Sequence, residues 1–508
     1  MAGAGDPLVV ATAAGLVRGE RRGDLAQWRG VPYAAPPIGA RRFRPPEPPA
    51  AWAGVRDATR FGAASAQSRD LRLAMMSGIT DKIATDEDCL TVNVFAPAPG
   101  AGGPYPVVVW IHGGAFVMGT TATPLYHGGA FAADGVVMVT VNYRLGLAGM
   151  LYLGELAPGY AAGNCALLDQ IAALRWVRDH IAGFGGDPGQ VTVMGESAGA
   201  IAIGALLAMP AARGLFHRAI LQSGASALAM PGRAEATALA RRVIAALGVE
   251  AAALADVPIE RLLEVQAALV AGVGVGTLAP YVDGVSLPAP AIDALCAGSA
   301  AGVPVLLGTN RDEWTLFEVL FGEQTIDALR GPLTARLGDA LAPLLAAYRA
   351  ERPEPRTDAA ATQRAWVDLI GDAVFRLPCV RLAEAQAAAG APAYLYRFDW
   401  PSPSFGGRLG AGHAVELPFV WNRLDLAFAQ LVIGSDAARQ QPLASAVHAS
   451  WVAFIRTGDP NGGGLPTWPT YDATRRATMR IDRPAEVVDD LGGATRALWP
   501  ARLGPARP

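Results

Sequence analysis

A strand, a sharp turn and a helix are predicted between residues 191 and 208. Residues 191–194 have the pattern of a short buried strand and residues 200–208 that of a buried helix. The turn between them, GESAG at 195–199, is a Gly-x-Ser-x-Gly motif whose glycines leave room for the neighbouring strand and helix. Ser197 would stand exposed there, beside the free N–H groups of the helix N-terminus. Ser197 is therefore the candidate nucleophile, and the chain must also supply a base, an acid and an oxyanion hole.

Composition narrows the class of protein. The chain has 508 residues, of which 52% are hydrophobic, so it is long enough for a large core. The net charge is −3 and the basic residues are not clustered, which argues against nucleic acid. The uncharged stretches 90–133 and 265–282 are interrupted by Gly, Pro and polar residues, so neither is expected to span a membrane.

The N-terminus and the cysteines predict a cytoplasmic protein. The first residues show no charged segment followed by an apolar one, so no secretory signal is expected. Four cysteines lie far apart in the sequence and without the spacing of a metal site. Both features fit a reducing compartment.

The hydrophobic pattern predicts an α/β fold. Short apolar segments separated by Gly and Pro indicate antiparallel strands within 8–60, whereas later strands are continuously apolar and alternate with helices. Such strands form a large, mostly parallel central sheet with helices on both faces. The later strands are expected at 106–111, 136–142, 191–194, 218–223, 303–308 and 393–398.

The helical segments outside this alternation predict the walls of a site. We expect a helix at 167–184 and a final helix at 442–456, with Pro442 in its first turn. Ala-rich helical stretches predict insertions at approximately 225–300 and 315–390. Residues 65–88 are expected to form a mobile surface loop, in which Leu71, Leu73, Met75 and Met76 could cover an apolar surface. No repeat or linker is recognisable, so residues 1–508 are predicted to form a single domain.

The candidate base is found by elimination among six histidines. In this topology the order is serine, acid, histidine, which leaves His217, His413 and His448. His217 follows Ser197 too closely to come after an acid, and His448 lies at helical spacing from apolar residues and is expected to be packed. His413 lies in a Gly-rich loop after the strand 393–398, and an imidazole there can take up and return the serine proton.

Four carboxylates are candidates for the acid. Asp312 and Glu313 follow a buried strand at its C-terminal end, where such sheets form their ligand crevices. Asp283 has the pattern of a turn residue, and Asp399 is expected to be structural. The residues alone do not separate Asp312 from Glu313.

The oxyanion hole is expected in the loop WIHGGAF at 110–116. This loop follows the buried strand 106–111, and its glycines allow the backbone to approach a tetrahedral intermediate closely. The N–H group of Ala198 would be the contribution of the turn itself.

With these residues in place, the chain resembles the type-B carboxylesterase family, which includes bacterial para-nitrobenzyl esterases, animal carboxylesterases and cholinesterases. The resemblance covers nearly the whole chain and implies the α/β-hydrolase fold. It rests on RFRPPEP at 42–48, EDCLTVN at 87–93, HGGAF at 112–116, NYRLG at 142–146, the stretch 163–188, GESAG at 195–199, LQSG at 221–224, NRDE at 310–313 and GH at 412–413.

The resemblance assigns roles that the residues left open. It implies that Glu313 is the acid and that the N–H groups of Gly114, Ala115 and Ala198 form the oxyanion hole. It also implies two buried structural ion pairs, which would join Arg42 to Glu87 and Arg144 to Asp169.

Two departures from the family pattern carry information. Secreted members pair the cysteine that corresponds to Cys89 with an upstream cysteine, but the matching region 61–67 holds Ser65 instead. Cholinesterases place a tryptophan in the loop before that cysteine to bind a quaternary ammonium, whereas residues 79–88 contain no aromatic residue, so no choline specificity is expected.

The expected function is that of a serine carboxylesterase acting on small to medium uncharged esters, with a small-molecule ester as its partner. The same groups could instead act on a carbamate, an activated amide, a lactone or a polyester. A non-catalytic binding protein is a second alternative, although such members typically lose a triad residue. No metal or organic cofactor is implied, and a monomer or small homo-oligomer is expected. Candidate pocket walls are Phe116, Met118, Trp314, Phe317, Trp366, Phe405 and Trp421.

Overall fold

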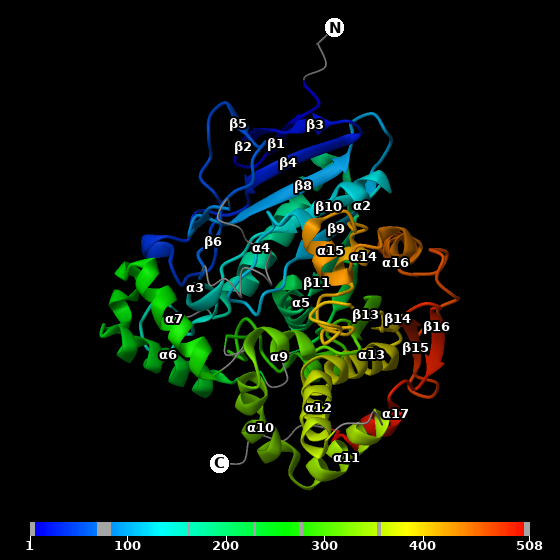
Figure 1. The fold of residues 1–508 in the computed structure, drawn as a ribbon. Coiled ribbons are helices and arrows are strands. Elements are labelled where there is room, and N and C mark those ends of the chain that lie inside the picture. Colours follow the sequence, from blue (N-terminus) through cyan, green and yellow to red (C-terminus); the bar gives the residue numbers. More distant parts are fainter. Residues whose placement is uncertain are drawn as a thin grey trace.

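A long twisted sheet runs through the centre of the computed structural model, which describes residues 6–68, 83–160, 163–226, 230–273, 278–352 and 357–501 (Figure 1). Within these ranges the sheet has 11 strands in the order β16-β15-β14-β13-β12-β11-β9-β10-β8-β4-β3. Its strands are β3 (Glu20–Arg22), β4 (Leu25–Pro32), β8 (Thr91–Pro97), β9 (Tyr105–Ile111), β10 (Val137–Val141), β11 (Gly186–Glu196), β12 (Arg218–Gln222), β13 (Val305–Asn310), β14 (Ala393–Phe398), β15 (Ala477–Ile481) and β16 (Glu486–Asp489).

The centre of the sheet is parallel and its two ends are antiparallel. Parallel pairing runs without interruption from β10 through β9, β11, β12, β13 and β14 to β15. Antiparallel pairs attach β8, β4 and β3 at one end and β16 at the other. A separate small sheet pairs β1 (Val9–Thr12) with β2 (Gly15–Arg18) antiparallel and β2 with β5 (Val55–Asp57) parallel. The predicted large, mostly parallel sheet is confirmed.

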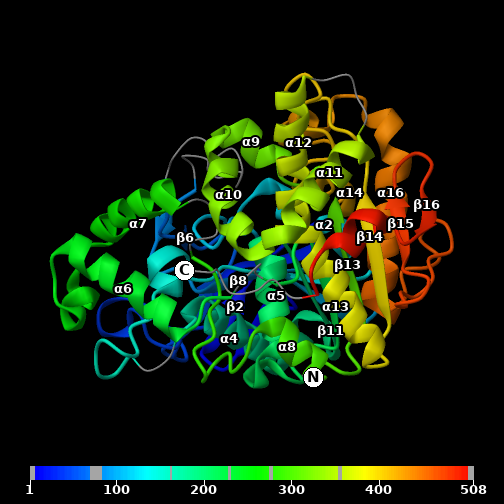
Figure 2. The same ribbon diagram turned by 90° about the horizontal axis from the view of Figure 1, so that it is seen from below.

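Both faces of the sheet are covered by helices. Successive side chains of a strand point to opposite sides, so a continuously apolar strand has apolar side chains on each face. In β9, Val107 and Val109 belong to one core cluster, whereas Val108 and Trp110 belong to another. The first face is covered by α4 (Cys165–His180), α5 (Ala198–Ala208), α8 (Ala291–Cys296) and α13 (Leu377–Ala388), which lie together on one side of the sheet in Figure 2. The second face is covered by α2 (Gly129–Ala133), α14 (Leu417–Val420) and α16 (Ala437–Thr457).

Helical insertions project beyond these layers. The first contains α6 (Arg233–Leu247) and α7 (Ile259–Val273), which form an outlying pair in Figure 1. The second contains α9 (Thr315–Phe321), α10 (Gln324–Leu337), α11 (Leu341–Glu351), α12 (Asp358–Gly371) and the π-helical turn η7 (Asp372–Arg376), which leads into α13. Buried residues of the second insertion form a core cluster of their own.

The end of the chain differs from the prediction. Helix α16 begins at Ala437, five residues before Pro442, because the Asp436 side chain caps it by accepting the N–H of Arg439. Pro442 therefore lies inside the helix and not in its first turn. Nor is α16 the last element, because β15, β16 and the short helix α17 (Gly493–Leu498) follow it.

The segment expected to be a mobile loop, 65–88, lies largely outside the described residues, as do Leu71, Leu73, Met75 and Met76. Its two described ends meet where β6 (Ala64–Ser65) pairs with β7 (Thr85–Asp86). No described helix has the length and apolar character needed to cross a membrane.

Two predicted ion pairs are present in the fold. Arg42 donates to both carboxylate oxygens of Glu87, and Arg144 donates to both oxygens of the buried Asp169. Cys89 is a buried free thiol, as expected, and burial raises its pKa to about 12.

Candidate active site

Ser197 stands at a sharp turn between β11 and α5. Its backbone has φ 57° and ψ −122°, which is a strained conformation for a residue with a side chain. A Cβ at position 199 would lie 2.0 Å from the Ile111 carbonyl oxygen, and one at position 195 would lie 2.7 Å from the Gly199 backbone. The predicted close approach of strand and helix at these two glycines is therefore confirmed.

His413 and Glu313 are brought together at the ends of neighbouring strands. Glu313 follows β13 and His413 lies in the loop after β14. The Nδ1 atom of His413 lies 2.6 Å from Glu313 Oε2, and both side chains are buried. The other carboxylate oxygen, Oε1, accepts the backbone N–H of Asn310 at 2.7 Å. The carboxylate is thus fixed at both ends and orients the imidazole ring.

Three buried carboxylates surround this imidazole. The Nε2 atom of His413 lies 3.0 Å from Glu196 Oε1, although that oxygen has no hydrogen-bond partner among the described residues. Burial lowers the pKa of His413, but the charges of Glu196 and Glu313 outweigh it and raise that pKa to about 9. Burial raises the pKa of Glu196 to about 8 and also raises the pKa of Glu416. The site therefore favours the imidazolium form more than water does.

The loop after β9 lies directly against the turn. A Cβ at Gly113 would lie 2.7 Å from Glu196 Oε2, so only glycine allows this approach. Gly114 and Ala115 have φ values of 112° and 52°, and within the described residues their N–H groups have no backbone acceptor. Ala198 is the first residue of α5, where an N–H group has no partner within the helix. All three residues line the cavity that also contains Ser197.

This cavity has a volume of about 460 Å³. Ser197 and His413 lie on its wall beside the loop that contains Gly114. Part of the wall is mainly apolar and comes from the second helical insertion, where Leu329, Pro332 and Leu333 of α10 line the cavity. Such a space suits a small organic molecule with apolar parts.

The structure divides the predicted pocket residues into two groups. Phe116, Trp314 and Phe317 line this cavity, and the Trp314 and Phe317 rings stack with centroids 4.6 Å apart.

The other predicted pocket residues lie elsewhere. Met118 packs in the main core below the Gly114 loop, and Trp366 belongs to the core of the second insertion. Phe405 is 48% exposed and lines a neighbouring cavity of about 410 Å³, and Trp421 is fully buried against Trp110. Aromatic character alone does not tell a cavity wall from a core position.

Sequence reasoning missed two features of the site. The π-helical turn η7 directs Val374 and Phe375 to the cavity, and the Phe375 ring lies 4.7 Å from the ring of His413. Nothing in the sequence marks this turn, because a helical pattern continues on both sides of it. The contact of Glu196 with His413 is the second feature. The one sequence signal for it is the position of Glu196 immediately before Ser197.

The remaining candidates for base and acid are bound elsewhere. His448 is buried in α16, where Nδ1 contacts the Val420 carbonyl oxygen, and the exposed His217 accepts the Val191 N–H through Nδ1. Asp399 pairs with Arg397, and Asp283 accepts backbone N–H groups within its own turn, as predicted. The Asp312 carboxylate contacts three arginines and the backbone N–H of Ala411, whereas His413 Nδ1 contacts Glu313.

The sheet order, the strand–turn–helix at Ser197 and the insertions over the strand ends define the α/β-hydrolase class. The model of the carboxylesterase family matches residues 6–499. The chain belongs to this family and is a carboxylic ester hydrolase.

Similar proteins support this assignment. Para-nitrobenzyl esterase of Bacillus subtilis (strain 168) is 39% identical over 97% of this chain and 99% of its own length. Phenmedipham hydrolase of Pseudarthrobacter oxydans is 36% identical over 94% of this chain and 96% of its own. Among solved structures, a carboxylesterase of Geobacillus stearothermophilus has a TM-score of 0.86 at 40% identity, covering 97% of this chain and all of that chain.

Proposed function

We propose that this protein hydrolyses small to medium uncharged carboxylic esters through an acyl-enzyme on Ser197. The observation that carries the proposal is the contact of 2.6 Å between His413 Nδ1 and Glu313 Oε2, because His413 lines the same cavity as Ser197. An acid, an imidazole and a strained serine on one cavity are the groups that acyl transfer needs.

In the first half of the reaction, Ser197 Oγ attacks the ester carbonyl carbon while His413 takes the serine proton. Glu313 keeps the proton on Nδ1 of His413, so that Nε2 is free to accept, and stabilises the imidazolium that forms. The N–H groups of Gly114, Ala115 and Ala198 hold the oxyanion. The C–O bond then breaks, and His413 gives its proton to the leaving alcohol.

In the second half, water enters and His413 removes one of its protons. The hydroxide attacks the acyl carbon, the bond to Ser197 Oγ breaks, and the proton returns to the serine. The carboxylic acid product then leaves the cavity.

The test is the hydrolysis of p-nitrophenyl esters with acyl chains from C2 to C12, by the wild type and by Ser197→Ala. We expect turnover of the shorter chains by the wild type and a loss of several orders of magnitude in kcat for the variant. Cys296→Ser, which changes an exposed residue outside the cavity, is the control and should retain the activity. Substantial hydrolysis by Ser197→Ala, or none by the wild type on any chain, would refute the proposal.

A further inference from the structure

The segment that carries Glu313 is hydrogen-bonded to the loop that carries His413. The two stretches, 310–315 and 409–413, come from different strand ends and are about 100 positions apart in the sequence. Besides the contact of Glu313 with His413, four hydrogen bonds join them: Asn310 Nδ2 to the Gly412 carbonyl (2.7 Å), Asp312 N–H to the Ala411 carbonyl (2.8 Å), Ala411 N–H to Asp312 Oδ2 (2.9 Å) and Thr315 Oγ1 to the Leu409 carbonyl (2.6 Å).

Asp312 contributes to this connection with both its backbone and its side chain. The Asp312 N–H donates to the Ala411 carbonyl oxygen, and the Asp312 carboxylate accepts the Ala411 N–H. Ala411 lies two residues before His413, and Asp312 lies immediately before Glu313. The position of the imidazole relative to its carboxylate partner therefore depends on where the Asp312 side chain is held.

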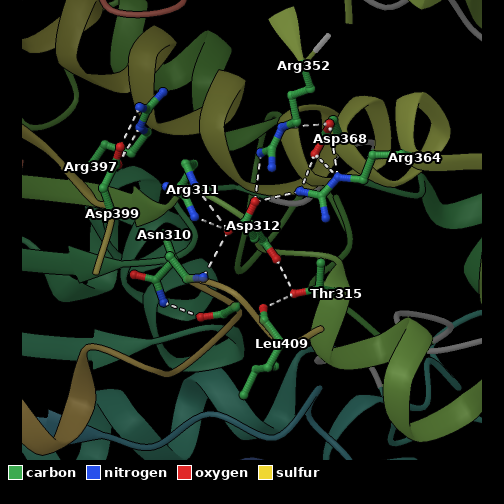
Figure 3. Close-up of polar contacts among 12 residues, drawn as sticks. Asn310, Arg311, Asp312, Thr315, Arg352, Arg364, Asp368, Arg397, Asp399 and Leu409 are labelled. Carbon is green, nitrogen blue, oxygen red and sulfur yellow. Dashed lines mark hydrogen bonds and ion pairs between the residues drawn. The ribbon is translucent and has the colours of Figure 1, made fainter. Parts of the chain in front are cut away.

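Three arginines hold that side chain, as Figure 3 shows. Arg352 and Arg364 donate to Oδ1 at 2.7 and 2.5 Å, and Arg311 donates to Oδ2 at 2.8 Å. The carboxylate is only 2% exposed. Burial raises its pKa, but the three guanidinium groups outweigh burial and hold the pKa well below its usual range. Asp312 is therefore a fixed anion, and every acceptor direction of its carboxylate is in use.

Two of these arginines belong to the helical insertion that forms the cavity wall. Arg352 directly follows α11 and Arg364 lies in α12. Asp368, one turn further along α12, contacts both of them. Helix α12 continues through η7, where Phe375 meets the His413 ring. The Asp312 carboxylate is thus a point at which the insertion is tied to the loop of His413.

We propose that Asp312 is a positioning residue, which holds His413 in register with Glu313 and is itself held by Arg352 and Arg364 from the insertion. This inference rests on the proposed function. Asp312 does not touch the substrate cavity among the described residues, so its effect on the reaction passes through Ala411.

Asp312→Asn is the decisive variant because it keeps the size of the side chain. An amide has one acceptor oxygen, so it cannot accept from both the arginines on one side and the Ala411 N–H on the other. Asp399→Asn is the matched control, since Asp399 is also buried and paired with an arginine beside the same strand ends (Figure 3), but among the described residues its side chain has no bond to the His413 loop.

We expect Asp312→Asn to lower kcat on p-nitrophenyl butyrate by about 10- to 100-fold, because a small displacement of a reacting group costs that much. KM should change by less than about threefold, because the cavity wall is intact. The low-pH limb of kcat/KM should move to lower pH, because a looser contact with Glu313 stabilises the imidazolium less. Glu196, Glu313 and Glu416 are the charged groups that raise the pKa of His413, and Asp312 is not among them. A purely structural loss would reduce the amplitude of the profile and leave its midpoint unchanged.

Asp399→Asn should retain both kcat and the midpoint, even where its Tm falls as far as that of Asp312→Asn. Equal losses of kcat in the two variants without a shift of the midpoint, or an unchanged Asp312→Asn, would overturn the inference.

If Asp312→Asn does not fold, Thr315→Val gives a second test. It removes the hydroxyl that lies 2.6 Å from both the Leu409 and the Asp312 carbonyl oxygens, and it should lower kcat and shift the midpoint in the same direction by less. An unchanged profile in folded Thr315→Val would then reject the inference. Failure of the proposed function looks different, because Ser197→Ala would then retain the wild-type rate whatever happens at residue 312.

Discussion

Glu313 Oε2 lies 2.6 Å from His413 Nδ1, and the other oxygen of the same carboxylate is held by the Asn310 backbone. The first oxygen therefore has little freedom to turn away from the ring. This arrangement determines which imidazole nitrogen carries the proton, and that choice can be tested by substitution.

Glu313→Gln should lower kcat by about 10²- to 10⁴-fold. The glutamine oxygen can still accept the Asn310 N–H, but its amide then presents N–H groups to Nδ1 of His413. The ring would respond by carrying its proton on Nε2, where it cannot accept the serine proton. Steady-state kinetics on p-nitrophenyl butyrate measures the loss, and circular dichroism shows whether the fold is retained. A decrease of less than about tenfold would mean that the charge and tautomer control at Glu313 matter little.

Glu196→Gln should move the low-pH limb of kcat/KM to lower pH. The neutral imidazole is the active base, so activity appears as pH rises through the pKa of His413. Glu196 helps to raise that pKa to about 9, so removing its charge lowers the pKa and extends activity towards acid. Initial rates between pH 5 and pH 10 measure the midpoint.

The control for this shift is Glu318→Gln, which changes a carboxylate on α9 that does not line the cavity. Its profile should follow that of the wild type. A Glu196→Gln profile that is unchanged, or shifted towards alkaline pH, would contradict the electrostatic explanation.

Gly114→Ala should lower kcat by about 10²- to 10³-fold, the usual effect of losing an oxyanion donor. Gly114 has φ 112°, and an added Cβ would lie 2.1 Å from the Met118 carbonyl oxygen, so the loop must move. Gly100→Ala is the control, because Gly100 also has a positive φ but its Cβ would meet nothing within 4 Å. Equal kinetics for the two variants would argue against a role of the loop in oxyanion binding.

Arg336→Ala should affect esters that carry a carboxylate more than neutral esters. Arg336 lines the cavity, and its Nε is buried without a hydrogen-bond partner among the described residues. Pairing with a substrate carboxylate should contribute about 1 kcal/mol, which is about fivefold in kcat/KM. The comparison uses p-nitrophenyl butyrate and the p-nitrophenyl monoester of succinic acid.

Arg330→Ala on the same helix α10 is the matched control, since Arg330 binds Gln363 and lies over the Trp366 ring outside the cavity. It should leave the ratio of the two substrates unchanged. A ratio that Arg336→Ala also leaves unchanged would show that this guanidinium does not contact the substrate.

Local chemistry was sufficient to predict the centre of the sheet and the turn at Ser197. The strand before Ser197 is continuously apolar, and the two glycines of the turn, Gly195 and Gly199, have no room for a Cβ. Both signals lie within a few residues of Ser197. The choice between Asp312 and Glu313 was not local. Both follow β13 at a crevice edge, and only the family resemblance favoured Glu313, which the structure places against His413.

The cavity wall was the least predictable part. Trp314 and Trp366 are both large aromatics of the second insertion, but only Trp314 lines the cavity. Which side of a helix faces a cavity depends on how the helices pack on one another, and this is not encoded in spacing alone. The sequence pattern places Pro442 in the first turn of α16, but the Asp436 side chain caps this helix and it begins five residues earlier.

The π-helical turn η7 separates two helices that pack against different parts of the structure. Helix α12 packs against α10 and α11 at the cavity wall, whereas α13 packs on β13 and β14 of the sheet. One residue rotates a helix by about 100°, so the wider turn changes the direction in which side chains face between α12 and α13. A deletion of one residue there could be absorbed by converting η7 to an ordinary α-turn, with Val374 and Phe375 shifted around the axis. A change in chain length at η7 would thus remodel the cavity wall of this protein without detaching α13 from the sheet.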